Sequence, residues 1–388
     1  MTGTRELVER MRENKTKLAI FNTVRRLGMV TALEIESEVD SSRPTILKYL
    51  DELVEEGLVV GQVHRSSGGR PPRIFGVNSS AAFSVGVDFG APNLSFVLIN
   101  LAKEVVDKME VQTDLKEPPS VTANWIVEGV RKMADIDGVR LEDQVLAVAV
   151  GLPCPIERCT ELVQPIPRLP QWKDVPLKAI LERELDLPVY VEVGPHLMVL
   201  GEKEFEEASR NMVYIHVREG IGMGAIVDGR LMKGANEDIG EIGHTIVSPG
   251  GPRCICGRRG CLEVFTSEPA IVGRARELME RDVTPTEVFV AAREGDAVAR
   301  EVVGEALDHL AIAIINVAML FDPEVIVLGG NIVQGGDFVI ERLKDRLREH
   351  RLENLDRGMR LKFSRLGIYT GALGAANFAL EKSLELPS

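Results

Sequence analysis

One histidine and three cysteines constrain this chain more than any other part of its sequence. His244, Cys254, Cys256 and Cys261 follow the spacing His-x9-Cys-x-Cys-x4-Cys, and two glycines lie between the last two cysteines. Thiolate and imidazole are the ligands that tetrahedral Zn²⁺ prefers, and three cysteines with one histidine leave no open coordination position. Glycine lets such a loop turn tightly enough to bring the sulfurs together. The spacing predicts one structural zinc ion per chain; the alternative is a group of free or disulfide-linked cysteines.

Two carboxylates flank these metal ligands. Glu241 precedes His244 by three residues, and Glu263 follows Cys261 by two. Carboxylates accept hydrogen bonds from hydroxyl groups, and a metal ion fixes the orientation of a histidine that binds it. The sequence therefore predicts that the metal loop also forms part of a polar pocket.

Length and composition limit what else the chain contains. A chain of 388 residues is expected to form two or three domains. No apolar run reaches the length of a membrane span, and the polar start has no signal-peptide pattern. Five cysteines fit metal binding in a reducing compartment better than a disulfide framework. We therefore expect a cytoplasmic protein with no membrane partner.

The charge of the chain is unevenly distributed. Its net value of −13 argues against a surface that binds nucleic acid everywhere. Residues 1–78 hold twelve Lys and Arg against eleven Asp and Glu, whereas the rest of the chain holds thirty-four against forty-eight. A cationic face is therefore expected only near the N-terminus.

Three short helices followed by a β-hairpin are predicted in residues 1–78. Helical periodicity, a capping-box spacing and two alternating apolar runs mark the elements. They are helices at 14–27, at 31–39 and from Ser41 or Ser42 to Gly57, and strands at 58–64 and 73–77. This order is typical of a winged helix-turn-helix domain.

Polar and cationic residues gather on the two elements of this domain that would face DNA. They are Ser42, Arg43, Thr45, Lys48 and Tyr49 on the third helix, and Arg65, Arg70 and Arg73 on the wing. These residue types contact base edges and phosphates, and arginine is attracted to a narrow minor groove. We therefore predict that they bind operator DNA; the alternatives are a protein-interaction module and an ordinary solvated surface.

Residues 79–388 follow an α/β pattern with two halves. The predicted strands are at 83–90, 94–100, 145–150, 189–193, 212–217, 224–227 and 323–330, and the predicted helices are at 120–133, within 268–320 and from 371 onward. Two such halves with a cleft between them predict a ligand site at strand ends.

The Glu-Ile-Gly-His run at 241–244 and the Cys-x-Cys-Gly-x-x-Gly-Cys-Leu-Glu run at 254–263 resemble the ROK family of sugar-responsive repressors, open reading frames and sugar kinases. Together with the winged helix, the resemblance covers the whole chain and points to the repressor branch. It implies a two-lobed, actin-like (ribonuclease H-like) ATPase fold, a zinc ion on His244 and the three cysteines, and a dimer or tetramer. The small lobe would span about 81–193 plus the C-terminal helix 371–388, and the large lobe about 194–370. It also implies that Glu241, His244 and Glu263 contact sugar hydroxyls.

Three departures from the family's kinases argue against phosphoryl transfer. Pro92 follows the first phosphate turn and has no N–H to offer a phosphate. Gly194 stands where the kinases have their catalytic Asp, and Glu219 adds a negative charge to the second phosphate loop. His196 is a candidate substitute for the missing base. We therefore expect no enzyme activity; the alternative is an ATP-dependent sugar kinase with an appended DNA-binding module.

Further departures concern the ligand pocket. Cys154 replaces the usual Gly, Arg168 replaces the usual Asn, and Val193 and Gly194 remove two polar groups that would hold a hexose. The effector is therefore expected to be a sugar, a polyol or a phosphorylated species, or no small molecule binds at all. The function that the sequence favours is a transcriptional regulator, most simply a repressor, of carbohydrate-utilisation genes. A third hypothesis is a regulator whose body docks on a sugar-transport component.

Overall fold

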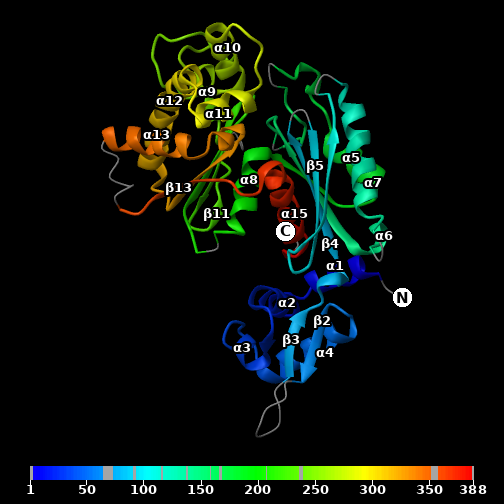
Figure 1. Cartoon of the computed structure of the whole chain (residues 1–388). Coiled ribbons are helices and arrows are strands. Elements are labelled where there is room, and N and C mark those ends of the chain that lie inside the picture. The colour runs from blue at the N-terminus through cyan, green and yellow to red at the C-terminus, as the bar shows by residue number, and fades with distance from the viewer. Residues whose placement is uncertain are drawn as a thin grey trace.

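The computed structural model describes residues 3–63, 73–90, 93–114, 117–136, 139–157, 159–165, 168–206, 208–235, 239–350 and 357–386. Figure 1 shows an N-terminal module below two lobes, with helices α8 and α15 between the lobes. Each lobe is built around one β-sheet, and the module has a small sheet of its own.

The N-terminal module contains the predicted three helices and hairpin, preceded by a helix that the sequence analysis did not predict. Its elements are α1 (Thr4–Arg12), α2 (Lys15–Leu27), β1 (Val30–Thr31), α3 (Ala32–Glu36), α4 (Arg43–Glu55), β2 (Val59–Val63) and β3 (Arg73–Val77). The strands form an antiparallel sheet in the order β1-β3-β2. Asn14 caps α2, and Thr31 and Glu34 form the predicted capping box at α3.

The two lobes repeat one sheet topology. The small-lobe strands are β4 (Phe83–Gly90), β5 (Asn93–Asn100), β6 (Val105–Gln112), β7 (Val145–Leu152) and β8 (Val189–Val193), and the large-lobe strands are β9 (Met212–Val217), β10 (Ile221–Val227), β11 (Arg230–Leu231), β12 (Val325–Gly330) and β13 (Arg360–Phe363). The strand orders of the two sheets are equivalent: β6-β5-β4-β7-β8 and β11-β10-β9-β12-β13. In each sheet the first three strands pair with one another in antiparallel fashion, and the last two strands run parallel to the central strand. This duplication confirms the predicted two-lobed, actin-like fold.

Helices cover the outer faces of both sheets. They are α5 (Pro119–Met133) and α7 (Leu177–Leu185) on the small lobe, and α9 (Glu263–Thr266), α10 (Glu268–Met279), α11 (Pro285–Glu294), α12 (Ala297–Phe321) and α13 (Gly336–Glu349) on the large lobe. The short helix α6 (Leu141–Gln144) lies at the lower end of the small lobe, next to α1. Short 3-10 turns are η1 (Ser79–Ala81), η2 (Pro170–Trp172), η3 (Ile242–His244), η4 (Asn331–Gly335) and η5 (Gly367–Tyr369).

Among the described helices, α12 alone is long and apolar enough to cross a membrane. A helix of this length was not predicted from the sequence. Its most apolar window has a mean hydropathy of 1.6, and 61% of that window is buried inside the protein. Leu307, Leu310 and Ile314 from this helix are fully buried in the large-lobe core. In this fold α12 is the central core helix of the large lobe.

Helices α8 (Gly194–Lys203) and α15 (Thr370–Ser383) cross between the lobes. A side chain on Gly374 would overlap the carbonyl oxygen of Leu197, and one on Gly201 would meet the carbonyl oxygen of Thr370. The two glycines therefore allow the helix backbones to touch. Because α8 contacts strands of both sheets, this crossing joins the two lobes.

The N-terminal module shares its core with the small lobe. Phe21 of α2 and Met11 of α1 belong to one buried cluster with Ile99 of β5 and Leu380 of α15. At the rim of this contact, Arg25 forms an ion pair of 2.7 Å with Glu381 of α15. The core therefore continues from the module into the helix that crosses between the lobes.

Candidate metal centre and ligand site

The four predicted metal ligands converge in the structure. The ligand atoms of His244, Cys254, Cys256 and Cys261 all lie within 4.8 Å of one another. The Sγ atoms of Cys256 and Cys261 are 3.6 Å apart, and Sγ of Cys254 is 3.6 Å from Nδ1 of His244. Two sulfurs on a tetrahedral ion with bonds of about 2.3 Å would be roughly 3.8 Å apart. The cluster therefore has the donor set and size to hold one metal ion.

Backbone turns bring the cysteines together. The N–H of Cys254 donates to the carbonyl of Arg258, and that of Gly257 donates back to Cys254, which closes the loop around Cys256. Gly257 has a φ of 90°, a left-handed conformation that favours glycine. This explains why the cluster forms within a single short loop.

The environment of the thiols differs from one to the next. A hydrogen bond with the Arg258 side chain lowers the pKa of Cys256 to about 6, whereas burial raises the pKa of Cys261 to about 12. Cys261 and Cys254 are buried, and Cys256 is half-buried. A thiolate that a cation stabilises is a better metal ligand than a neutral thiol.

His244 joins the metal centre to the predicted pocket. Its Nδ1 faces Cys254, and its Nε2 lies 3.9 Å from Oε2 of Glu241. A metal ion on Nδ1 would hold the ring in place and leave Nε2–H directed toward Glu241 and the pocket. The structure thus brings the predicted ligand contacts Glu241 and His244 side by side.

An arginine of the small lobe contacts Glu263 of the large lobe. The side chain is buried, and its Oε1 accepts a hydrogen bond of 2.8 Å from Nη2 of Arg168. Arg168 also donates to the carbonyl oxygen of Glu219. One guanidinium therefore bridges the small lobe to two points of the large lobe and covers the carboxylate predicted to bind a hydroxyl group.

A second charged group lies where the two lobes meet. Asp88 lies near the end of β4 at 6% exposure, and a side chain on Gly371 of α15 would overlap its carboxylate. Burial raises the pKa of Asp88 to about 7, although Arg218 favours its ionised form. Nε of Arg218 lies 3.5 Å from Oε1 of Glu268.

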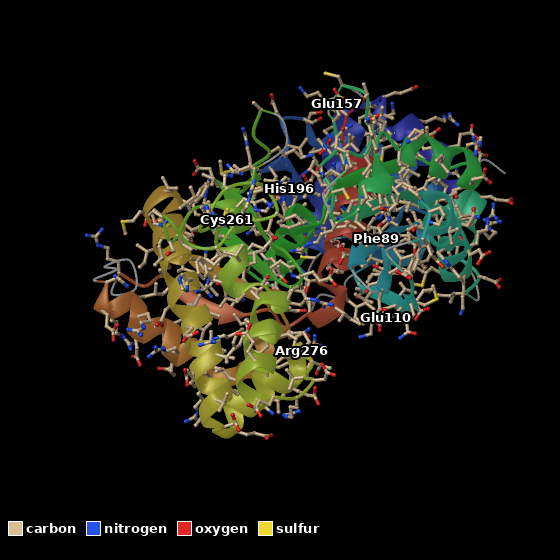
Figure 2. The ribbon with its side chains drawn as sticks, turned by 90° about the horizontal axis from the view of Figure 1, so that it is seen from above. Phe89, Glu110, Glu157, His196, Cys261 and Arg276 are labelled. Atoms are coloured by element: carbon tan, nitrogen blue, oxygen red, sulfur yellow. The ribbon has the colours of Figure 1, made fainter. Side chains whose placement is uncertain are left out.

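Gly194, at the expected catalytic-base position, lies beside Asp88 and has no side chain. A Cβ on Gly194 would lie 3.6 Å from Oδ1 of Asp88. His196 is fully buried, with Nδ1 3.0 Å from Oε1 of Glu192 and Nε2 3.0 Å from the carbonyl oxygen of Ile239. Figure 2 shows His196 between Cys261 of the large lobe and Phe89 of the small lobe in projection. Both ring nitrogens of His196 are therefore engaged within the protein.

Glu192 and His196 form a network that the sequence analysis missed. Burial alone would raise the pKa of Glu192, but the hydrogen bond with His196 and the ammonium of Lys233 lower it overall. Lys233 contacts the second carboxylate oxygen. The partners come from β8, α8 and the segment after β11, so sequence spacing gives no sign that they meet.

The residues predicted to contact DNA differ in their exposure and in their partners within the protein. Ser42 and Arg43 are exposed at the start of α4, where Arg43 lies 3.3 Å from Glu36. The hydroxyl of Thr45 lies 2.9 Å from that of Ser42, Lys48 is 3.8 Å from Glu52, and Arg73 is 2.6 Å from Asp51. Exposed ion pairs contribute little stability, so phosphate can replace them. Arg65 and Arg70 lie outside the described residues.

Tyr49 differs from the expectation that it points outward. Its ring packs against the module core, and its hydroxyl accepts a hydrogen bond of 3.1 Å from Nδ2 of Asn14. The reason is that position 49 lies next to Leu50 and Leu53 on the border of the buried face of α4. Tyr49 therefore holds α2 against α4.

Comparisons with known proteins agree with this arrangement. The model of the ROK family matches residues 84–382. A xylose repressor of Caldicellulosiruptor bescii is 27% identical over 391 aligned residues, 96% of each chain, and a glucokinase of Halalkalibacterium halodurans is 31% identical over 75% of this chain and 92% of its own. A solved ROK family transcriptional regulator, a homologue of the Escherichia coli Mlc protein, superposes with a TM-score of 0.81 at 24% identity over 95% of each chain. The chain therefore belongs to the ROK family.

Proposed function

We propose that this protein is a DNA-binding transcriptional regulator, acting as a repressor of carbohydrate-utilisation genes, whose ROK body binds a sugar or sugar-like effector. The observation that carries the proposal is the helical module and its hairpin, joined to the ROK body through one shared core. The similarity to the xylose repressor extends over 96% of this chain, whereas that to the glucokinase covers 75%.

Residues 1–78 would be the DNA-binding domain and residues 79–388 the effector domain. The small lobe would comprise about 81–193 with the C-terminal helix, and the large lobe about 194–370. One structural zinc on His244 and the three cysteines would hold the wall of the pocket. Effector binding would change the relation of the lobes, and a dimer or tetramer would place two modules on successive DNA half-sites.

Replacing Arg43 by alanine is expected to weaken binding to operator DNA by about 5- to 150-fold, because an arginine that contacts a base or phosphate contributes roughly 1–3 kcal/mol. Fluorescence anisotropy with the DNA upstream of the protein's own gene would measure this, at two salt concentrations. Arg348→Ala, a change of another exposed arginine in α13, is the matched control and should leave affinity unchanged. Equal affinity of both variants and the native protein would reject the role of α4.

Replacing Arg168 by asparagine is expected to strengthen the binding of neutral sugars about tenfold. The guanidinium occupies Oε1 of Glu263 at 2.8 Å, so a sugar hydroxyl must compete with an ion pair worth about 1 kcal/mol or somewhat more. Calorimetric titration with D-xylose and D-glucose would measure the change. Arg168→Lys keeps the charge and should remain weak; equal affinities of the asparagine and lysine variants would contradict the competition.

The proposal excludes phosphoryl transfer. Gly194 offers no base beside Asp88, and both ring nitrogens of His196 are engaged. Incubation with ATP, Mg²⁺ and a panel of aldoses should therefore give no sugar-dependent ADP. Turnover that disappears on changing Glu241 or Glu263 would restore the sugar-kinase alternative.

A further inference from the structure

His196 connects the start of helix α8 to the segment that carries Glu241. Its Nε2 lies 3.0 Å from the carbonyl oxygen of Ile239, 43 positions further along the chain. A carbonyl oxygen only accepts hydrogen bonds, so Nε2 carries the hydrogen and donates it. Ile239 precedes Glu241, the predicted effector contact, by two residues. The histidine therefore acts on the backbone that places this carboxylate.

The peptide group that accepts this hydrogen bond lies next to a glycine. It joins Ile239 to Gly240, and Gly240 has a φ of 105°, in the left-handed region. Glycine adopts positive and negative φ about equally well, so its own preference does not fix the orientation of the peptide. A hydrogen bond to the Ile239 carbonyl does fix it. Because Glu241 follows directly, the direction of its side chain depends on this bond.

Strand β10 supplies a second anchor for the same turn. The N–H of Met223 donates to the carbonyl oxygen of Gly240 at 2.8 Å, and a side chain on Gly240 would overlap the carbonyl oxygen of Met223. The N–H of Ile242 donates to the same Gly240 oxygen at 2.7 Å. The turn is thus held by β10 at Gly240 and by α8 at Ile239.

The ring of His196 is itself held in one orientation by Glu192. The two side chains are buried, and Nδ1 of the ring lies 3.0 Å from Oε1 of Glu192. The same oxygen accepts a hydrogen bond of 3.0 Å from the N–H of Val193, and Lys233 contacts the other carboxylate oxygen. A carboxylate that orients a histidine through one ring nitrogen leaves the other nitrogen aimed at its target. An apolar side chain would fill this space without burying a carboxylate, so the pair is better explained by its bond to Ile239.

We propose that His196 is a positioning residue for effector binding. Its Nε2–H holds the peptide between Ile239 and Gly240 in the orientation that directs Glu241 toward the effector, and Glu192 holds the ring. The inference rests on the proposed function, because it takes Glu241 as an effector contact. It adds the residue that places this contact.

The same network connects Glu241 to the small lobe. Glu192 lies in β8 of the small-lobe sheet, whereas Lys233 and Ile239 lie in the large lobe, after β10 and β11. His196 belongs to α8, which crosses between the lobes (Figure 1). A movement of one lobe against the other would therefore displace the anchor of Glu241.

Two substitutions of His196 separate its two contacts. His196→Gln keeps an N–H near the position of Nε2 and can donate to the Ile239 carbonyl, whereas His196→Asn is shorter and reaches only Glu192. Hydrogen exchange in the segment 240–245 of the full-length, zinc-loaded protein would be followed by mass spectrometry. Exchange there is expected to be about tenfold faster in His196→Asn, because one hydrogen bond is lost, and to stay within about threefold of the native rate in His196→Gln. His350→Asn, the same change at an exposed histidine that ends α13, is the matched control and should leave the rate unchanged.

Calorimetric titration with D-xylose and D-glucose gives a second readout. A sugar that binds the native protein is expected to bind His196→Asn about tenfold more weakly, because Glu241 is no longer held toward it, and to bind His196→Gln within about threefold of the native affinity. A histidine that only stabilised the fold would not give this difference between two variants of similar size.

The two readouts separate this inference from the proposed function. Equal exchange rates, or equal sugar affinities, in His196→Asn and His196→Gln would overturn the inference. Acceleration in His196→Asn that is as large in the metal loop, residues 252–261, would overturn it as well, because the whole fold would then have loosened. If neither sugar binds the native protein, the proposed sugar effector is contradicted, and the exchange rates still decide whether His196 holds the segment before Glu241.

Discussion

Replacing Cys261 by serine is expected to abolish stoichiometric metal binding and to lower the free energy of unfolding by about 4 kcal/mol or more. Cys261 is fully buried, and its Sγ lies 3.6 Å from that of Cys256. Serine is a poor ligand for a soft, tetrahedral site. A metal site of this kind forms only in the folded state, so the free energy of metal binding contributes to the free energy of folding. Loss of a metal site is among the most destabilising effects that a single substitution can have.

Metal analysis and urea unfolding would measure these two effects. The native protein should contain about one zinc per chain, and the variant should contain almost none. Cys159→Ser is the matched control, because Cys159 is exposed and lies in the small lobe away from the cluster. Unchanged stability after complete removal of the metal from the native protein would reject the structural role.

The parts of this protein that sequence reasoning predicted are those whose signal is local. The four candidate metal ligands lie close together in the sequence, so their spacing alone predicts that they converge. The strand Val189–Val193 and the helix from Lys15 to Leu27 were predicted to within a residue or two, because apolar periodicity and caps mark their ends. Seven of the ten strands in the two sheets were predicted in the same way, whereas β6, β11 and β13 were not.

What sequence reasoning missed depends on contacts between distant segments. Arg168 and Glu263 are 95 positions apart, and Arg25 and Glu381 are 356 apart. No periodicity connects such pairs, because their distance is set by how the lobes pack. Helix α1 was missed for a related reason: only Val8 and Met11 are buried, and they pack on the body of the protein as well as on α2.

These missed contacts change the picture of the cleft. The sequence indicated a kinase fold that had lost its base and phosphate groups. The structure adds two guanidinium contacts: Arg168 of the small lobe reaches Glu263 of the large lobe, and Arg218 lies 3.5 Å from Glu268 and favours the ionised form of Asp88. Guanidinium groups of the protein itself thus lie beside carboxylates where the two lobes meet.

Replacing Asp88 by asparagine is expected to raise the free energy of unfolding at pH 8 by up to about 4 kcal/mol. Burial raises the pKa of Asp88 to about 7 from an ordinary value of 3.8. Between pH 3.8 and about pH 7, Asp88 keeps its proton in the folded state but has released it in the unfolded chain. Stability from this group is therefore complete at low pH and falls by about 1.4 kcal/mol per pH unit as pH rises toward 7. Asparagine is nearly isosteric and stays neutral, so the cost of ionising a buried group disappears.

Urea unfolding from pH 5 to pH 8 would measure this as a difference between the two proteins, which should grow with pH and level off above about 7. The difference isolates Asp88 from His216, whose pKa is lowered by desolvation and which acts in the opposite direction, losing stability as pH falls. Asp228→Asn, at an exposed aspartate of the large lobe, is the matched control and should be neutral. A variant less stable than the native protein at pH 8 would mean that Asp88 is held ionised by Arg218, and that their attraction outweighs the cost of burial.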